Sequence, residues 1–171
     1  MTTSEGAALT IRPVTLDDLE VLIDIYLDTA IHHAAIDPAW FHVPARADVA
    51  IRLRRRIESR GVDSENGAYV AAMLDGRMVG SATIFPDDLA APGSMMRPIR
   101  TAEFGVSVLD GFRGHGIGRA LIEHVEGWAA THGVERVILN VAEANVDAIR
   151  LYRALGYEPY DRAMRKAIAR P

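Results

Sequence analysis

Three glycines alternate with other residues in the segment Arg113-Gly114-His115-Gly116-Ile117-Gly118. A strand-like stretch precedes this segment and a helical pattern follows it. Glycines let a backbone turn tightly and approach a ligand, and the N–H groups and dipole at a helix start attract anions. Arg113 adds a cation able to meet phosphate oxygens. The segment is typical of a pyrophosphate-binding loop, although a tight turn without a ligand explains the glycines alone equally well.

Two other kinds of phosphate loop have a different spacing. A P-loop requires Gly-Lys followed by Ser or Thr, whereas Gly116 is followed by Ile117. The dinucleotide fingerprint requires G-x-G-x-x-G in a parallel unit, with an acidic residue about twenty residues later. The glycines at 114, 116 and 118 do not match it. Both alternatives are therefore excluded.

Hydrophobic spacing and turn residues predict the elements that position this loop. A helix is expected after an N-cap at Thr15, and the Asp75-Gly76 pair predicts a hairpin. Strands are expected at Leu9–Arg12, Tyr69–Leu74, Met78–Ile84, Ala102–Leu109 and Arg136–Val141, and two weak strands at Tyr157–Asp161 and Met164–Ile168. Further helices are expected at Val49–Arg60, Gly116–His132 and Asn145–Leu155. A loop is expected at Pro86–Pro98. This order predicts an α/β (α+β) fold, a mixed, mostly antiparallel sheet with helices on its faces.

Length and composition limit the class of protein. The 171 residues fit one domain, 1–171, and a net charge of -4 argues against a generic nucleic-acid binder. The absence of cysteine excludes disulfides, thiolate metal sites and cysteine nucleophiles. Met1 to Thr10 shows no secretory signal, and no apolar run approaches the roughly 18 residues of a membrane span. A cytoplasmic protein without membrane or nucleic-acid partners is expected.

Two segments resemble the motifs of one enzyme family. The segment from Val106 to Gly118 resembles the acetyl-CoA motif of the GCN5-related N-acetyltransferase (GNAT) superfamily, which has the core R/Q-x-x-G-x-G/A. The family's second signature is similar to Asn140-Val141, Asn145 and the stretch from Leu151 to Tyr157. Many members have a different turn where this chain has Leu109-Asp110-Gly111. The resemblance implies a splayed sheet of six to seven strands with about four helices, and a cofactor wedged where two parallel strands part.

The resemblance also implies the donor and the residues that bind it. Acetyl-CoA would be the donor and CoA a product. Asn145 would hydrogen-bond the pantetheine, and Tyr152, seven residues further along the same helix, would give a proton to the leaving thiolate. An N-cap role for Asn145 and a core role for Tyr152 are the alternatives. The implied cofactor-binding residues are Val106, Ser107, Val108, Arg113, Gly114, His115, Gly116, Ile117, Gly118, Asn145 and Tyr152.

The acetyl acceptor needs a second kind of residue. An amine must be neutral to attack a thioester, yet a lysine-like amine has a pKa of about 10.4. A general base would therefore help, and Glu103 is the best candidate, because it lies where several family members carry a catalytic glutamate. A surface role or an acceptor-binding role for Glu103 is the alternative. Without a cysteine, we expect direct transfer in a ternary complex.

Two further clusters carry weaker signals. His32-His33 is a poor metal site, since adjacent helical residues diverge, and no metal is expected. The arginine run from Arg52 to Arg60 is typical of a solvated helix face, but it could also attract an acidic acceptor or the phosphates of the cofactor. Tyr26, Trp40 and Phe41 are apolar candidates near the acceptor, with core packing favoured for Tyr26.

The sequence thus predicts an N-acetyltransferase for a small primary amine, such as an amino acid or related metabolite. An enzyme that acetylates a protein N-terminus or lysine is the alternative within the same class. A non-catalytic acyl-CoA-binding sensor is the alternative from another class. The resemblance favours a homodimer.

Overall fold

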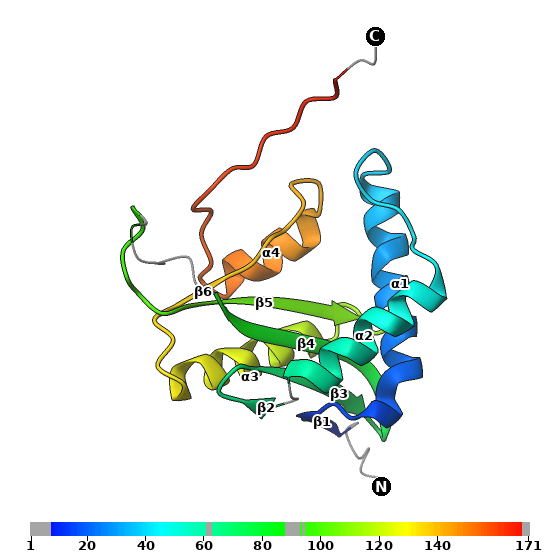
Figure 1. Cartoon of the computed structure of the whole chain (residues 1–171). Helices are drawn as coiled ribbons and strands as arrows, with labels where there is room; N and C mark the ends of the chain where they lie inside the picture. Colours follow the sequence, from blue (N-terminus) through cyan, green and yellow to red (C-terminus); the bar gives the residue numbers. More distant parts are fainter. Residues whose placement is uncertain (1–7, 61–62, 88–92, 94, 169–171) are drawn as a thin grey trace, which may run out of the picture. The chain divides into compact units, whose positions relative to one another are not determined.

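The computed structural model describes residues 8–60, 63–87, 93 and 95–168, apart from the side chains of Arg60 and Asp87. The chain forms two compact units, Met1–Asn140 and Val141–Pro171. The described residues of the first unit build a six-stranded sheet with helices α1, α2 and α3, and those of the second build helix α4 (Figure 1). A single domain over 1–171 stays a prediction.

The sheet is mixed and mostly antiparallel, as the sequence predicts. Its strands are β1 Leu9–Pro13, β2 Asp63–Ser64, β3 Gly67–Leu74, β4 Arg77–Asp87, β5 Thr101–Val108 and β6 Arg136–Ile138. The order is β1-β3-β4-β5-β6, with β2 also paired to β3. In the described part of the chain, β5 and β6 pair in parallel and the other pairs are antiparallel. The predicted hairpin turn joins β3 to β4, with φ of 50° at Asp75 and 78° at Gly76.

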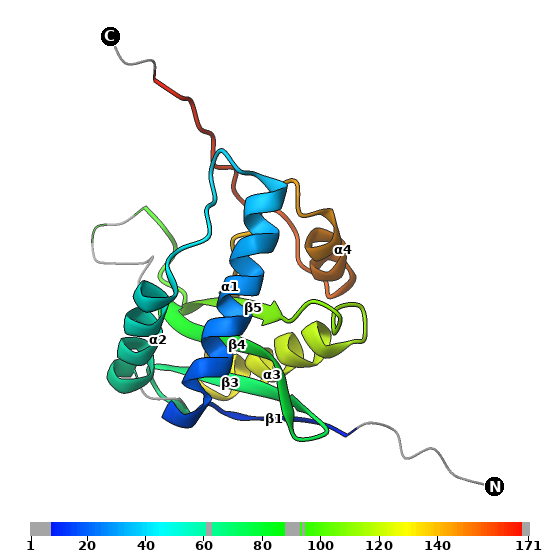
Figure 2. The ribbon, with the colours of Figure 1, turned by 90° about the vertical axis from the view of Figure 1, so that its right-hand side faces the viewer.

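Helices cover both faces of the sheet. A short 3-10 turn η1 (Leu16–Asp18), α1 (Leu19–Ile36) and α2 (Arg46–Arg60) lie on one face, and α3 (Ile117–Thr131) lies on the other (Figures 1 and 2). The core between the sheet and the first helices includes apolar residues at helical spacing from α1 and α2, together with residues of β3 and β4. Its members include Leu19, Leu22, Ile23, Val49, Leu53, Ile57, Tyr69, Ala71 and Met78. On the opposite face, a Cβ built on Gly80 would lie 3.2 Å from the Leu121 side chain, so α3 packs directly on β4.

The start of α1 is fixed by charged groups. The Asp18 carboxylate accepts the backbone N–H of Thr15 at 2.8 Å and two guanidinium N–H groups of Arg12 at 2.7 and 2.8 Å. The hydrogen bonds from Arg12 lower the pKa of Asp18, although burial opposes this shift. The predicted helix start after Thr15 is confirmed, with Asp18 as the residue that ties it to β1.

Several predicted boundaries are wrong. The strand predicted at Arg136–Val141 ends at Ile138, and the weak strands predicted at Tyr157–Asp161 and Met164–Ile168 have no regular structure. Tyr160 and Met164 in this tail are 64% and 92% exposed. These apolar residues are therefore not buried against a sheet. The strand β4 extends to Asp87, into the predicted loop, of which residues 88–92 and 94 lie outside the described residues.

The sequence pattern does not predict the start of one helix or the presence of one short strand. Helix α2 starts at Arg46 instead of Val49, because its first turn is polar and gives no apolar spacing. The two-residue strand β2 pairs with β3 and is too short to show alternation. In the second unit, α4 (Val146–Ala154) confirms the predicted helix within one residue at each end. No helix in the described part of the chain has the length and hydropathy needed to cross a bilayer.

Candidate functional site

The parallel pair β5 and β6, the one such pair among the described strands, separates after three residues. Pairing between β5 and β6 covers Thr101 to Glu103 and Arg136 to Ile138, whereas β5 continues beside β4 as far as Val108. The N–H of Leu109 donates to the Val79 carbonyl on the β4 side at 2.9 Å. Because hydrogen-bonding directions alternate along an antiparallel pair, the backbones of Val108 and Val106 point away from β4, and that of Ser107 points toward it. Beyond Glu103, β5 therefore presents an edge to which an extended chain with amide groups could pair.

The glycine-rich loop begins where this edge ends. Gly111, Gly114 and Gly116 have φ of 79°, 79° and 83°. A Cβ built at any of the three meets no atom within 4 Å. Glycine is therefore required by the left-handed backbone, which costs other residues roughly 1–2 kcal/mol, and not by crowding.

Helix α3 starts directly after the loop. Its N-cap is Gly116, and its first turn contains no acidic residue. The Gly116 carbonyl accepts the Ala120 N–H at 3.0 Å, which is the first bond of the helix. The early N–H groups of α3 have no side-chain cap at Gly116, so the positive end of the helix dipole is directed at the loop. This arrangement can bind an anion.

The Arg113 side chain ties the loop to helix α1. Its Nε donates to the Val108 carbonyl at 2.9 Å, and its Nη2 forms an ion pair with Asp28. Asp28 also accepts the backbone N–H of Asp110 at 3.2 Å. The Arg113 and Asp28 side chains are 35% and 26% exposed. The predicted contact of Arg113 with phosphate stays a prediction; in this structure its side chain orders the loop.

Glu103 lies at the point where β5 and β6 part. Its Oε1 accepts a hydrogen bond from Nδ2 of Asn140, just beyond the end of β6, at 2.9 Å. Its side chain is on the face covered by α1 and α2, because Gly105, two residues along, aligns through Thr83 with the core residue Tyr69. Glu103 is exposed, and Asn140 orients its carboxylate.

The two predicted residues of the second unit lie on α4. The Asn145 side chain accepts the Ala148 N–H at 3.3 Å, which confirms the N-cap interpretation. The Tyr152 ring contacts Tyr157 edge-on, with centroids 5.9 Å apart, and burial raises the pKa of the Tyr152 phenol. Contacts of Asn145 and Tyr152 with a cofactor stay predictions from the motif.

Two functional candidates have no clear sequence signal. Asp28 meets Arg113 across 85 positions of sequence, and Asn140 meets Glu103 across 37. Asn140 belongs to the second family signature, but the sequence does not show that its side chain hydrogen-bonds to Glu103. Among the described residues, no three His, Asp or Glu side chains are grouped so as to hold a metal ion. His33 instead hydrogen-bonds through Nδ1 to the Thr29 carbonyl at 2.8 Å.

Known proteins are similar to this chain in sequence or in fold. Streptothricin acetyltransferase of Streptomyces lavendulae is 32% identical over 99 residues, which cover 58% of this chain and 48% of that protein. The matched region therefore spans about half the length of that relative. A crystal structure of a tetramutant of the BH1408 protein from Bacillus halodurans superposes with a TM-score of 0.81 at 19% identity, covering 93% of this chain and 99% of the other. The aminoglycoside N-acetyltransferase AAC(6')-Iy in complex with CoA has a TM-score of 0.68 at 22% identity, covering 98% and 99%.

A family model extends the agreement over most of the chain. The model described as "Acetyltransferase (GNAT) family" matches residues 27–157. This range includes the open edge of β5, the glycine-rich loop and α4. The fold that the sequence resemblance implies is confirmed by the splayed mixed sheet and by the structural neighbours. The chain belongs to the acetyltransferase (GNAT) family.

Proposed function

We propose that this chain transfers an acetyl group from acetyl-CoA to the primary amine of a small molecule, by direct attack in a ternary complex. One observation carries the proposal: the open edge of β5 leads without interruption into the left-handed glycine loop at the start of α3. An acyl-CoA has the matching order of groups, with pantetheine amides followed by a pyrophosphate.

The residues present fit such a donor. The backbones of Val106 and Val108 point to the side where β5 has lost β6, and they would pair with the pantetheine amides. The amides from Arg113 to Gly118 would hold the pyrophosphate, and the dipole of α3 would add positive potential. The Val108 carbonyl already accepts a hydrogen bond from Arg113. The Val108 N–H is therefore the group that we assign to acetyl-CoA.

Glu103 would take the proton that the acceptor amine must lose. Asn140 holds Oε1, and Oε2 can accept this proton directly or through a water molecule. The amine nitrogen then attacks the thioester carbonyl, the C–N bond forms and the C–S bond breaks. The departing thiolate receives a proton from the Tyr152 phenol, and the phenolate regains one from the nitrogen, directly or through water, which leaves a neutral amide. Since burial raises the pKa of Tyr152, the phenol keeps that proton at neutral pH.

The names of the relatives support a small acceptor. Streptothricin acetyltransferase and the aminoglycoside N-acetyltransferase are named for small amines. We therefore prefer a small-molecule amine to a protein N-terminus or lysine. A non-catalytic acyl-CoA sensor is disfavoured, because pure binding requires neither an oriented carboxylate at Glu103 nor a protonated phenol.

Amine-dependent release of CoA tests this function. The wild-type protein should release thiol from acetyl-CoA with at least one amine in a panel of amino acids, amino sugars and short peptides. Glu103→Gln should lower kcat about 100-fold or more, and Tyr152→Phe should lower kcat more than acetyl-CoA affinity. Glu65→Gln and Tyr160→Phe are matched controls at exposed positions and should be close to wild type. Acetyl-CoA binding without turnover on any amine would support the sensor instead.

A further inference from the structure

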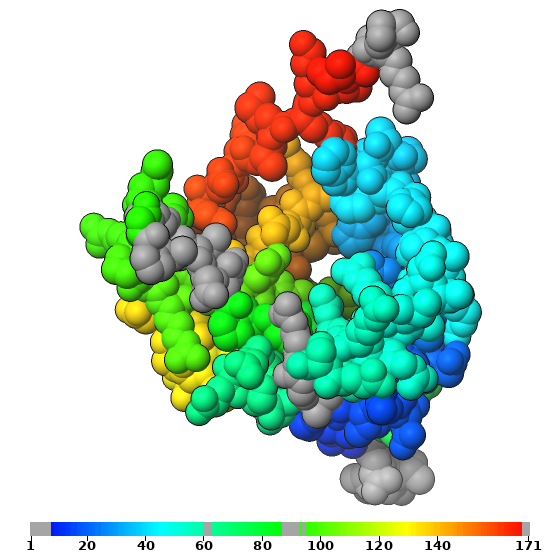
Figure 3. All heavy atoms as spheres, in the orientation of Figure 1, coloured from blue at the N-terminus to red at the C-terminus, as the bar shows by residue number. Residues whose placement is uncertain are grey.

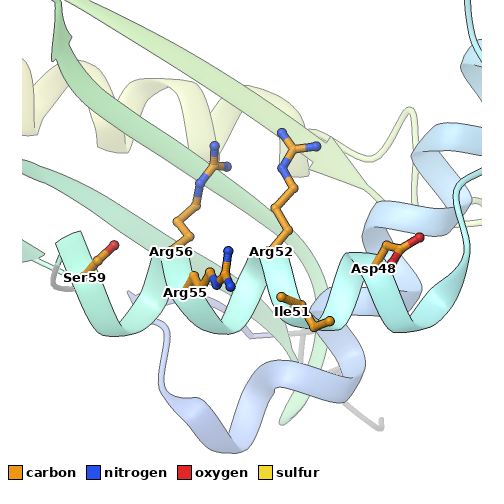
Figure 4. Close-up of a pocket in the computed structure, with 6 residues that line it drawn as sticks. All are labelled: Asp48, Ile51, Arg52, Arg55, Arg56 and Ser59. Atoms are coloured by element: carbon orange, nitrogen blue, oxygen red, sulfur yellow. The ribbon is translucent and has the colours of Figure 1, made fainter.

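Helix α2 presents two guanidinium groups on the face of the sheet that carries Glu103. Arg52 and Arg56 are four residues apart and so lie on one side of the helix. Figure 4 shows both side chains extending from α2 in the same direction. Nη1 of Arg52 donates to the Tyr26 hydroxyl at 2.6 Å, and its Cζ lies 5.2 Å from the centre of the Tyr26 ring. Tyr26 thus fixes Arg52 between α2 and α1.

Arg56 reaches the strand beside Glu103. Its Cζ lies 5.5 Å from the centre of the Phe85 ring. Phe85 on β4 is the direct cross-strand partner of Glu103 on β5. Directly opposed side chains share a face, with Cβ atoms about 4.5–5.5 Å apart. The Phe85 ring lies over Gly67 on β3, since a Cβ built on Gly67 would clash with it. Arg56 therefore shares the face of the sheet with Glu103 and lies about two strand spacings, roughly 10 Å, from it. An acceptor with several bonds between its amine and its acid can span this distance.

Helix α2 carries an excess of positive charge. The helix has six arginines and two acidic residues in a chain whose net charge is -4. Arg54 pairs with Glu58, and Arg46 pairs with Glu20 and Asp24. Within the described residues, the polar partner of Arg52 is the neutral Tyr26 hydroxyl. Acids of the protein thus neutralise other arginines of α2 and leave Arg52 with an uncharged partner.

Both guanidinium groups act on the same buried tyrosine. Burial raises the pKa of Tyr69, while the charges of Arg56 and Arg52 oppose this increase. Both charges therefore lie within electrostatic range of Tyr69 on β3. An open hollow of about 340 Å³ runs along α2, lined by Asp48, Ile51, Arg52, Arg55, Arg56 and Ser59. In the space-filling view, α2, drawn in turquoise, lies at the surface of the first unit (Figure 3). A small solute can reach these arginines.

We propose that Arg52 and Arg56 bind a carboxylate or phosphate group on the acceptor, so that the preferred substrate is an amine that also carries an acid. This inference rests on the proposed function, because it takes Glu103 as the site of amine deprotonation. Guanidinium groups bind carboxylate and phosphate through paired hydrogen bonds. Several ammonium groups on one acceptor, as in an aminoglycoside, would meet repulsion from Arg52, Arg55 and Arg56. The acceptor therefore differs in charge from those that the relatives are named for.

Matched acceptors test the inference directly. Glycine, β-alanine and γ-aminobutyrate would be compared with their carboxamides, and phosphoethanolamine with ethanolamine. We expect kcat/KM to favour the acid member by about tenfold or more in at least one pair, mainly through KM. The carboxylate and phosphate pairs show which acid is preferred. Equal values for acid and neutral members in all pairs, or preference for an aminoglycoside, would overturn the inference and leave the acetyltransferase proposal intact.

Variants assign the preference to α2. Arg52→Gln and Arg56→Gln should each lower the acid-to-amide ratio several-fold, and the double variant should bring it close to one. Arg52→Lys should keep part of the ratio, because the charge remains. Arg54→Gln removes an exposed arginine paired with Glu58 and should leave the ratio unchanged. An unchanged ratio in the double variant would refute the role of these arginines.

A binding measurement tests the anion site independently of acetyl transfer. Succinate should raise the melting temperature of the wild-type protein more than succinamide, and the double variant should lose the difference. If no amine is acetylated but this difference is present, the proposed function fails and the anion site stands. If amines are acetylated but succinate has no specific effect and the double variant keeps its acid-to-amide ratio, the anion site fails and the proposed function stands.

Discussion

The ion pair between Asp28 and Arg113 gives a quantitative test of how the glycine loop is held. Asp28→Asn keeps the shape of the side chain but removes its charge. It weakens the bond to Arg113 and the bond to the Asp110 N–H, whereas the bond from Arg113 to the Val108 carbonyl remains. Hydrogen bonds to charged groups contribute about 1.5–3 kcal/mol. Since the pair is about one-quarter to one-third exposed and one acceptor oxygen is kept, we expect a loss of about 1–2 kcal/mol.

This loss should appear in donor binding. If the donor must restore the order of the loop, its affinity falls about 5- to 30-fold, because 1.4 kcal/mol is a factor of ten. Titration calorimetry with CoA measures the effect. Asp24→Asn is a matched control four residues earlier on α1, in an exposed ion pair with Arg46. It should change affinity less than twofold or threefold.

The opposite result would be equally informative. Without Asp28, the Arg113 guanidinium could turn to the phosphates, as the sequence pattern suggests. Tighter or unchanged CoA binding by Asp28→Asn would therefore refute the loop-ordering role of the pair. It would support direct phosphate binding by Arg113 instead.

Three other predictions concern backbone, pH and stability. Gly116→Ala should weaken CoA binding about 5- to 30-fold in the same titration, because φ is 83° there and the strain is roughly 1–2 kcal/mol. Asp18→Asn should lower the free energy of unfolding at pH 7, measured with urea, by about 1–2 kcal/mol. Since the folded pKa of Asp18 is lowered, this advantage of the wild type is full above about pH 4 and disappears as the pH falls through the folded pKa. Burial raises the pKa of Tyr152 above its ordinary value of about 10, so kcat should not fall between about pH 7.5 and 9.5.

Local patterns predict much of this fold. The Asp75-Gly76 turn and the helices α1 and α3 all depend on residues close in sequence. The pattern fails where burial decides the outcome. Apolar residues in the tail suggest strands, but Met164 is exposed and the tail forms no strand in its described residues. Arg136–Val141 looks like a long buried strand, yet β6 ends at Ile138, where β5 diverges from it.

The candidate site shows the same limit. The glycine loop is predicted because its backbone conformation requires particular residues at fixed positions. Glu103 is predicted only through resemblance, and its partner Asn140 becomes visible when the register of β5 and β6 is known. The sequence leaves two interpretations of the arginines of α2 open. The contacts with Tyr26 and Phe85 distinguish Arg52 and Arg56 from Arg54, and no spacing rule supplies them.

Single-turnover mass spectrometry tests the central claim most directly. Excess protein loaded with acetyl-CoA would be mixed with an acceptor amine, quenched at intervals, and analysed for CoA, acetylated amine and intact protein mass. The proposed direct transfer predicts that acetylated amine appears at the rate of CoA release and that the protein mass is unchanged. It also predicts that Glu103→Gln binds acetyl-CoA normally but forms product about 100-fold more slowly. Acetylated protein that forms before the product, or CoA release without any acetylated amine, would contradict it.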